Sequence, residues 1–527
     1  MLAEVRTPGG KDKSGKNTMR KKRKNPRILV VTPEITYLPE GMGNYSHYLH
    51  AKAGGMADVS ASLVAALFKQ GADVHVALPH YRQMFHIDVG KLISDELRVY
   101  MSHLSNSRIH LAEDRIFYYC DRVYSNYSDD TMRQALAFQR EVINNIIPSV
   151  EPDLIHCNDW MTGLVPAAAR RMGIPCLFTL HNIHTSKTTL AEIEDRGIDA
   201  AQFWQDLYYE RQPLNYEESR SGNHVDMLTS GIFASHFINT VSPTFLREIV
   251  DGWHDFIPGW IRSEIVAKYH AGCATGILNS PDEDCCPEID PYIVMKFDTT
   301  SHATAKQINK IAFQERTGLK VNQNAPLFLW PSRLDPVQKG CSLLAEALYD
   351  IVHKYYDNDL QIAIVANGSY QHVFRDIVAF HGFYDRVTVC DFDEELSRQG
   401  MAGSDFILMP SLFEPCGLPQ MSCQRYGSLP VVHNTGGLHD TVEVLDVENH
   451  TGNGFRFDVY DSCGLKWAID QAMEFFRRPA EVKAREIARI MEEAAVRFNY
   501  RVTAQRYIDI YEKMLARPLV QHPVVGE

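Results

Sequence analysis

Short apolar runs alternate with amphipathic stretches through the first half of the chain. The apolar runs are continuous, which is typical of parallel strands that are buried on both faces of a sheet. The amphipathic stretches have the helical period of about 3.6 residues. Together they predict a doubly wound α/β domain. The predicted strands are residues 27–35, 73–79, 153–156 and 175–180, and the predicted helices are 56–69 and 162–172.

The same alternation begins again after about residue 270, so the fold class is α/β with two doubly wound, Rossmann-like domains. The predicted strands of the second half are residues 326–330, 360–365, 386–390, 406–410 and 429–432, with a helix at 341–355 and a charged helical stretch at 480–515. We place the N-terminal domain at 27–270 and the C-terminal domain at 271–484, joined in the Gly-, Pro- and Asp-rich stretch 272–291. Residues 485–527 are expected to form a helical segment that packs back on the N-terminal domain.

Charge is distributed unevenly along the 527 residues, which are too many for one ordinary core. The net charge is −13, but residues 1–27 hold ten Lys and Arg against two acidic residues, so this end carries about +8 and the remainder about −21. A body this acidic argues against nucleic-acid binding. Residues 1–26 are predicted to be a disordered basic tail, because they hold few apolar residues.

The sequence also indicates in which cellular compartment the protein is expected. No run reaches the roughly 18–20 apolar residues that span a bilayer, and the basic tail lacks the apolar centre of a secretory signal. The eleven cysteines are an odd number spread through predicted strands, which favours reduced thiols. We therefore expect a cytoplasmic protein with no membrane partner.

Residues 411–437 are the most informative stretch. A buried strand is followed at once by Glu414, and a helical run is expected to begin through residues 415–417. The next strand ends in residues 435–437, Thr-Gly-Gly. Neighbouring strand ends form the ligand crevice of open α/β sheets, and free N–H groups at a helix start favour phosphate. The stretch therefore predicts a crevice with one carboxylate and bare glycine backbone.

Two other strand ends carry basic residues. Arg333 and Lys339 lie in a loop after a predicted strand, where two cations can clamp a diphosphate and neutralise a leaving phosphate. Solvated surface cations are the common alternative. Lys52 precedes Gly54 and Gly55 at the start of a predicted helix, and paired glycines let backbone approach a phosphate or sugar closely. A plain glycine turn is an equal alternative there.

Polar residues also end two strands of the first half. His181 follows the strand at 175–180, where it can hydrogen-bond a sugar, although a structural histidine is the usual alternative. Asp159 and Trp160 follow the neighbouring strand. A carboxylate beside an indole suits carbohydrate, because the carboxylate binds hydroxyls and the ring stacks on a sugar face; a core tryptophan is the alternative.

Other motifs give weaker signals. Gly41-Met42-Gly43 follows no strand and precedes no clear helix, so it lacks the context of a dinucleotide site and does not favour an oxidoreductase. Asp391 and Asp393 form a D-x-D pattern that is better explained by a loop or a helix N-terminus than by a metal. The zinc-protease, P-loop and nucleophile-elbow motifs are absent.

In chain order, these segments resemble the bacterial and plant glycogen/starch synthases, from about residue 27 to about 515. The resemblance is carried by KAGGMADV (52–59), HCNDW (156–160), HN (181–182), TVSPTFLREI (240–249), GILN (276–279), SRLDPVQKG (332–340), FEPCGLPQ (413–420) and NTGGLHDTV (434–442). It implies a GT-B fold, with two Rossmann-like domains facing across a cleft. It also implies a retaining glucosyltransferase that moves glucose from ADP-glucose, or UDP-glucose, to the non-reducing 4-hydroxyl of an α-1,4-glucan.

The resemblance further implies roles for single residues. Arg333 and Lys339 are expected to hold the diphosphate and Glu414 to contact the donor glucose; with His181 they form the implied catalytic set. The implied substrate-binding residues are Lys52, Gly55, Asp58, Asp159, Asn279, Phe392 (at the base-stacking position), Cys416, Gly417, Leu418, Thr435, Gly436 and Gly437. Because two cations make the diphosphate a good leaving group, we expect no metal and no cofactor, and the leaving phosphate is expected to take the acceptor proton.

Departures from the family pattern gather on the acceptor side. About ten extra residues, rich in Tyr and His (Tyr37, Tyr45, His47, Tyr48 and His50), precede Lys52. Residues 183–186 replace a small-aromatic-Gln-Gly stretch, and Ser280 follows GILN where the family has glycine. Two alternatives stay open: a GT-B enzyme with a different small-sugar acceptor, and a non-catalytic glucan-binding homologue.

Overall fold

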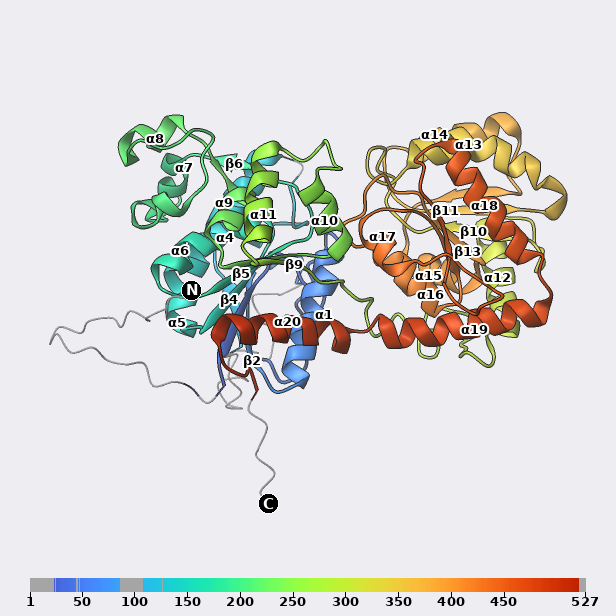
Figure 1. The fold of residues 1–527 in the computed structure, drawn as a ribbon, viewed down its shortest axis with the longest axis horizontal. Coiled ribbons are helices and arrows are strands. Elements are labelled where there is room, and N and C mark those ends of the chain that lie inside the picture. The colour runs from blue at the N-terminus through green and yellow to red at the C-terminus, as the bar shows by residue number, and fades with distance from the viewer. Residues whose placement is uncertain are drawn as a thin grey trace, which may run out of the picture. The chain divides into compact units, whose positions relative to one another are not determined.

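The structure is a computed structural model that describes residues 23–520, except 24, 44, 45, 47, 86–107 and 126. Contacts divide the chain into two compact units (Figure 1). The first unit comprises Met1–Thr240, Ile249–Ile277 and Thr503–Glu527, and the second comprises Val241–Glu248 and Leu278–Val502. The predicted tail, residues 1–26, lies almost wholly outside the described residues.

The first unit is built on a sheet of seven parallel strands in the order β3-β2-β1-β4-β5-β8-β9. The strands are β1 (Arg27–Val31), β2 (Asp73–Pro79), β3 (Ile109–Ala112), β4 (Leu154–Asn158), β5 (Cys176–Leu180), β8 (Phe237–Thr240) and β9 (Ala274–Gly276). The strand order reverses between β1 and β4. The carboxyl ends of these two strands are therefore at the position where open α/β sheets bind ligands.

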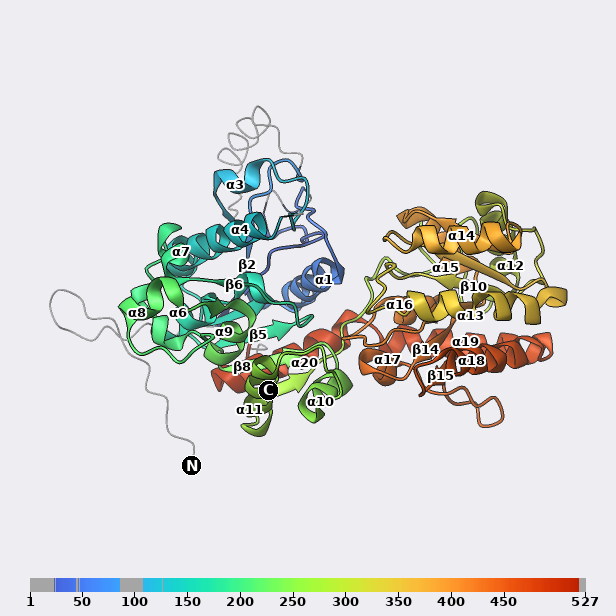
Figure 2. The same ribbon diagram turned by 90° about the horizontal axis from the view of Figure 1, so that it is seen from above.

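Helices surround this sheet, as Figure 2 shows from a second direction. They are α1 (Gly55–Lys69), α3 (Arg115–Tyr118), α4 (Ser128–Glu141), α5 (Ile147–Val150), α6 (Val165–Arg171), α7 (Leu190–Asp195), α8 (Tyr216–Gly222), α9 (Met227–Ala234) and α11 (Gly259–His270), with a π-helical turn at Val142–Ile146. A small antiparallel pair, β6 (Lys187–Thr188) and β7 (Val225–Asp226), lies beside α7 and α8 in sequence.

The end of the chain also joins the first unit. Helix α20 (Tyr500–Leu515) places Tyr511 Oη 2.8 Å from His156 Nδ1 on β4. Asn239 Nδ2, on β8, donates to Tyr507 Oη at 3.1 Å. These buried bonds tie the last helix to the sheet. Of the predicted segment 485–527, residues 485–502 belong to the second unit and the rest to the first.

The second unit has six parallel strands in the order β12-β11-β10-β13-β14-β15. The strands are β10 (Leu327–Trp330), β11 (Gln361–Val365), β12 (Val387–Cys390), β13 (Phe406–Met409), β14 (Leu429–His433) and β15 (Phe455–Phe457). The helices are α12 (His302–Thr317), α13 (Cys341–Lys354), α14 (Gln371–His381), α15 (Glu394–Gly403), α16 (Pro419–Arg425), α17 (Gly436–Thr441), α18 (Ser462–Phe476) and α19 (Ala480–Arg497). Helix α10 (Pro243–Asp251) contributes its residues up to 248 to this unit.

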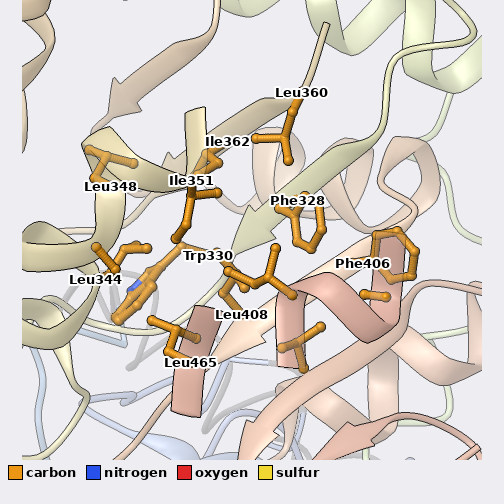
Figure 3. Packing of buried hydrophobic residues seen from close by; sticks show 14 of the residues in the cluster. Phe328, Trp330, Leu344, Leu348, Ile351, Leu360, Ile362, Phe406, Leu408 and Leu465 are labelled. Carbon is orange, nitrogen blue, oxygen red and sulfur yellow. The ribbon is translucent and has the colours of Figure 1, made fainter. Parts of the chain in front are cut away.

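The core of the second unit explains why its central strands, β10 and β13, are apolar throughout. Phe328 and Trp330 of β10 face one cluster, where they pack with residues of α13 and α18 (Figure 3). Leu327 and Leu329 of the same strand face a second cluster with residues of α12 and α15. Because both faces are covered, no strand position can be polar without a buried partner. The predicted parallel sheet is confirmed.

One predicted strand boundary differs from the structure. The strand predicted over residues 27–35 ends at Val31, because Pro33 has no N–H to donate to a neighbouring strand. All eleven cysteines are free thiols. Among the residues that the structure describes, none of the helices combines the length and apolar character needed to cross a bilayer.

Candidate active site

The carboxyl ends of β10 and β13 lie next to each other where the strand order of the second sheet reverses. The loop after β10 carries Arg333 and Lys339, and the loop after β13 carries Glu414. Leu412 N–H donates to the carbonyl of Gln338 at 2.8 Å, which joins the two loops. This is the place at which open α/β sheets bind ligands.

Lys339 and Glu414 form a buried ion pair at this edge of the sheet. Lys339 Nζ lies 2.5 Å from Glu414 Oε2, and only 12% and 6% of the two side chains are exposed. Ser411 Oγ donates to the same carboxylate oxygen at 3.2 Å. Arg333, on the same loop as Lys339, is exposed. The structure therefore brings a buried carboxylate and one predicted cation into direct contact, with the second cation at the surface nearby in sequence.

Glycine is required where the next loop approaches Glu414. A Cβ on Gly436 would lie 2.0 Å from the carbonyl oxygen of Glu414, and a Cβ on Gly437 would lie 2.0 Å from that of Cys416. Gly436 also has a positive φ of 44°. The backbone that follows β14 is thus in contact with the backbone that follows β13, as the sequence predicted for bare glycine.

The N–H groups predicted to bind ligand in this loop already have partners. Thr435 N–H donates to the His433 carbonyl at 3.0 Å, and Gly437 N–H donates to the Glu414 carbonyl at 2.9 Å. Gly436 N–H donates to Glu248 Oε1 at 2.8 Å. In this structure the loop therefore serves to hold Glu414, and its three donors are occupied.

The helix after Glu414 begins later than predicted. Helix α16 starts at Pro419, not within residues 415–417, because Gly417 has φ +72° and cannot continue a right-handed helix. Among the described residues, no acceptor contacts the backbone N–H groups of Cys416, Gly417 and Leu418. These three donors are therefore available to a ligand oxygen.

Asn279 lies beside this segment. Its backbone N–H donates to the Cys416 thiol, and burial raises the pKa of that thiol to about 12. Asn279 is 5% exposed. Its side-chain Oδ1 has no hydrogen-bond partner within the described part of the chain. A buried acceptor without a donor is costly, so this amide oxygen is suited to a ligand hydroxyl.

Phe392 follows β12, which ends at Cys390, and is 51% exposed. Its N–H donates to Asn367 Oδ1 at 2.9 Å. The acidic residues on either side are engaged elsewhere: Asp391 accepts from Gln371, and Asp393 caps α15. The helix N-terminus interpretation of this D-x-D pattern is confirmed for Asp393. In the ranges that the structure describes, no three His, Cys, Asp or Glu side chains are grouped to hold a metal ion.

The first unit has its own cluster at the β1–β4 switch point. Glu34, which follows β1, is 2% exposed and accepts the N–H groups of Ala53 at 2.6 Å and Gly54 at 3.0 Å. Burial raises its pKa to about 6. Lys52 Nζ lies 2.9 Å from Asp58 Oδ2. The glycine loop before α1 is therefore held by hydrogen bonds to a buried carboxylate.

Gly55 is the first residue of α1, as the glycine motif predicted for a helix start. Lys52 and Gly55 both lie at the exposed beginning of this helix. The predicted residues Lys52, Gly55 and Asp58 thus share one short segment of the first unit.

Asp159 and His181 meet at the ends of β4 and β5. His181 N–H donates to Asp159 Oδ1 at 2.8 Å, and Asn182 Nδ2 donates to Oδ2 at 3.2 Å. Burial raises the pKa of Asp159 to about 7. Its backbone combines φ +55° with ψ −179°, a region that is essentially restricted to glycine, and strain of this kind clusters at functional sites.

The tautomer of His181 follows from its neighbours. Burial lowers its pKa to about 3, so the ring is neutral. Its Nε2 lies 2.9 Å from Asn158 Oδ1, and Asn158 Nδ2 donates to the Val31 carbonyl at 3.2 Å. With the amide oriented this way, Nε2 carries the proton and Nδ1 is an acceptor.

Two neighbouring residues have structural roles. His156 Nε2 lies 2.6 Å from Thr179 Oγ1 and its other nitrogen contacts α20. Trp160 is 5% exposed and makes an edge contact with the His184 ring at a centroid distance of 5.9 Å. The core alternative for this tryptophan is confirmed, because its ring is not available for stacking on a sugar.

Sequence reasoning missed three carboxylates that organise these clusters. Glu34 lies inside the strand predicted over residues 27–35, and its place near the end of that strand was a usable signal. Glu248 and Asp440 lie inside the segments TVSPTFLREI and NTGGLHDTV, but nothing in the sequence indicates that these segments bind each other.

The chain matches two family profiles and many curated proteins. Residues 27–257 match the starch synthase catalytic domain, and residues 325–474 match glycosyl transferases group 1. The glycogen synthase of Bacillus subtilis is 32% identical over 446 residues, which cover 81% of this chain and 88% of that protein. The chain belongs to the glycogen synthase family. The family's member from Cellvibrio japonicus is also 32% identical, over 88% of this chain and 96% of that protein.

Solved structures agree with this membership. The catalytic domain of starch synthase IV from Arabidopsis thaliana, bound to ADP and acarbose, has a TM-score of 0.72 at 25% identity and covers 94% of this chain and 100% of that chain. The sucrose-phosphate synthase of Thermosynechococcus elongatus has a TM-score of 0.55 at 16% identity, over 93% of this chain and 99% of that chain, and shares the fold alone. As a glycogen synthase family member the protein is a glycosyltransferase, and the predicted GT-B fold is confirmed.

Proposed function

We propose that the protein transfers glucose, with retention, from ADP-glucose to the non-reducing 4-hydroxyl of an α-1,4-glucan. The observation that carries the proposal is the Lys339–Glu414 contact at the switch point of the second sheet. The relatives named glycogen synthase support the acceptor. The starch synthase IV structure, which contains ADP, supports the donor.

The reaction breaks the bond between glucose C1 and the diphosphate oxygen. Negative charge then grows on the diphosphate and positive charge grows on the sugar ring. Lys339 and Arg333 neutralise the negative charge on the diphosphate, which makes a metal unnecessary in this proposal. Glu414 accepts hydrogen bonds from hydroxyls of the donor glucose and faces the positive charge that grows on the sugar ring. The acceptor hydroxyl forms the new bond to C1 on the same face, and its proton passes to the departing phosphate oxygen.

The remaining donor contacts follow from available hydrogen-bonding groups. The N–H groups of residues 416–418 suit phosphate or sugar oxygens, because they have no acceptor in the described structure. Asn279 Oδ1 suits a sugar hydroxyl for the reason given above. Phe392 offers an exposed ring for stacking on the base.

The first unit contributes hydrogen-bond acceptors. A neutral His181 with its proton on Nε2 presents Nδ1 as an acceptor for a sugar hydroxyl. Asp159 fixes the backbone of His181 and the side chain of Asn182. We assign His181 to the glucosyl unit and Lys52 to the diphosphate, with Asp58 orienting Lys52.

A nucleotide-sugar panel tests the proposal. Purified protein is incubated with ADP-, UDP- and GDP-glucose, each with glycogen or maltooligosaccharides, with and without EDTA. We expect ADP-glucose to transfer label to glycogen in α-1,4 linkage, unchanged by EDTA. The matched variant Glu414→Gln keeps the shape of the side chain and is expected to abolish transfer. No transfer from any nucleotide sugar, or full activity in that variant, would overturn the proposal.

A second candidate is transfer to a small sugar acceptor, favoured by one observation. The insertion before Lys52 is closed at its neck by Ile35 and Ala51, whose backbones exchange hydrogen bonds of 2.9 and 2.7 Å. His50 Nδ1 lies 3.0 Å from the Thr36 carbonyl, while Tyr45 and His47 lie outside the described residues. The two ends of this loop therefore lie directly beside the Lys52 segment. Label in a soluble sugar, with none in glycogen, would decide for this candidate.

A further inference from the structure

Helices α10 and α17 cap each other within the second unit. Glu248, on α10, accepts Gly436 N–H at 2.8 Å and Thr435 Oγ1 at 3.3 Å, both at the start of α17. Asp440, on α17, accepts Thr244 N–H at 3.1 Å and Thr244 Oγ1 at 2.6 Å, at the start of α10. Each helix therefore supplies the carboxylate that satisfies the free N–H groups of the other.

The arrangement is specific rather than incidental. Glu248 is 4% exposed, and a buried carboxylate is stable only where donors surround it. Thr435 stands at the N-cap position of α17 but its side chain makes no cap bond within its own helix. Its hydroxyl donates to Glu248 instead. The capping group of α17 thus comes from a residue 188 positions away.

The capped residue precedes a residue that contacts the backbone of Glu414. Gly436 is bonded to Glu248, and the next residue, Gly437, donates its N–H to the backbone carbonyl of Glu414 at 2.9 Å. The tight approach of both glycines leaves no room for the loop to shift without moving the backbone at Glu414 and Cys416. Any loosening of the α17 start is therefore transmitted to Glu414.

We propose that Glu248 is a positioning residue for Glu414, acting through the first turn of α17. The proposal rests on the proposed glucosyl transfer, because Glu414 is the group being positioned. It assigns a purpose to the TVSPTFLREI segment, which makes no contribution to the reaction described above. Glu248 acts by hydrogen bonds of defined length, so its reach matters more than its charge.

Three substitutions separate length from charge. Glu248→Gln keeps the length and one acceptor oxygen, Glu248→Asp keeps the charge but is one methylene shorter, and Glu248→Ala removes both. Asp251→Ala is the matched control, since Asp251 is an exposed carboxylate on the same helix. We expect kcat to fall about 10- to 100-fold in the Ala variant with KM changed less than about threefold, because misplacing a reacting group by about 1 Å has effects of this size.

The decisive result is the order of the activities that the variants retain. Positioning predicts that the Gln variant retains more activity than the Asp variant, and that the control matches the wild type. Higher activity in the Asp variant would show that charge matters and would overturn the proposal. So would an Ala variant with unchanged kcat, or one in which only KM changes.

Backbone hydrogen exchange supplies a readout that does not depend on turnover. Peptides covering residues 411–418 and 434–441 are expected to exchange faster in the Asp and Ala variants than in the Gln variant and the control. Unchanged exchange in all variants would overturn the proposal. If the wild type transferred no sugar, the proposed function would fail, while the exchange order would still report whether Glu248 holds this loop.

Discussion

The two strand-edge clusters use buried carboxylates in different ways. In the first unit, Glu34 and Asp159 are held by neutral N–H donors, and burial raises the pKa of both, to about 6 and about 7. In the second unit, Glu414 is held by the ammonium of Lys339 and by a hydroxyl. The same residue type at the same place in a sheet is thus a loop anchor in one unit and half of an ion pair in the other.

The difference has a physical cause. A neutral donor compensates only part of the hydration that a carboxylate loses on burial, so the protonated form is favoured and the pKa is raised. A cation compensates far more and also supplies charge that a reaction can use. The carboxylates of the first unit therefore hold backbone in place, whereas the second unit carries the ion pair that the proposed reaction uses.

The largest expected effect comes from breaking the ion pair. Lys339→Met leaves Glu414 buried without its cation, and we expect a loss of about 3–5 kcal/mol in the free energy of unfolding and a fall in kcat of about 10²- to 10³-fold. The double variant Lys339→Met/Glu414→Gln is expected to recover most of the stability and none of the activity. Denaturant unfolding and initial rates measure the two quantities. Recovery of activity in the double variant would contradict the assignment.

The next effect compares the glycine motifs of the two clusters. Gly437→Ala places a Cβ 2.0 Å from the Cys416 carbonyl, and we expect a loss of about 3 kcal/mol or more. Gly54→Ala meets only Glu34 Oε1, at 4.0 Å, so it is expected to change stability by less than about 1 kcal/mol. Thermal unfolding of both variants checks the contrast. Equal destabilisation would show that the two motifs share one steric role.

A smaller effect depends on pH. Asp159 has a pKa near 7 in the fold, against 3.8 as its ordinary value, so the folded state binds more protons than the unfolded state between these values. Stability is therefore lost as pH rises. Relative to Asp159→Asn, the wild type is expected to lose about 2–3 kcal/mol between pH 5 and 8. Melting temperatures of the two proteins across this range test the slope; a parallel pair of curves would refute it.

The smallest effect concerns Glu34, which holds the glycine loop before α1. Glu34→Gln keeps one acceptor oxygen for the N–H groups of Ala53 and Gly54, so we expect a cost of about 1 kcal/mol with faster hydrogen exchange confined to residues 52–58. Glu40→Gln, at an exposed carboxylate of the neighbouring loop, is the control. A loss as large as that of Lys339→Met would mean that the two clusters do not differ in the way described.

The sequence predicted the parts of the site that depend on strand ends. Continuous apolar runs marked the parallel strands, and parallel strands bring their carboxyl ends to one edge. Lys339 and Glu414 could therefore be placed together without knowing the structure. Residues 435–437 were correctly placed against Glu414 for the same reason.

The rest depends on contacts that no local pattern encodes. Whether the N–H of Gly436 is free depends on Glu248, far away in the chain. Whether Trp160 is available to a sugar depends on packing against His184. Helix α16 starts later than predicted because Gly417 has a positive φ, a backbone conformation that the pattern of residues does not reveal.

The neck formed by Ile35 and Ala51 has a consequence for how the protein can change. Because two backbone hydrogen bonds close the insertion at its base, the distance between its ends is fixed independently of what lies between them. Segments inside such a neck can be lengthened, shortened or exchanged as a cassette while Glu34 and Lys52 keep their places. For the small-sugar candidate, this means that the acceptor can change without any change in the residues proposed to bind the donor.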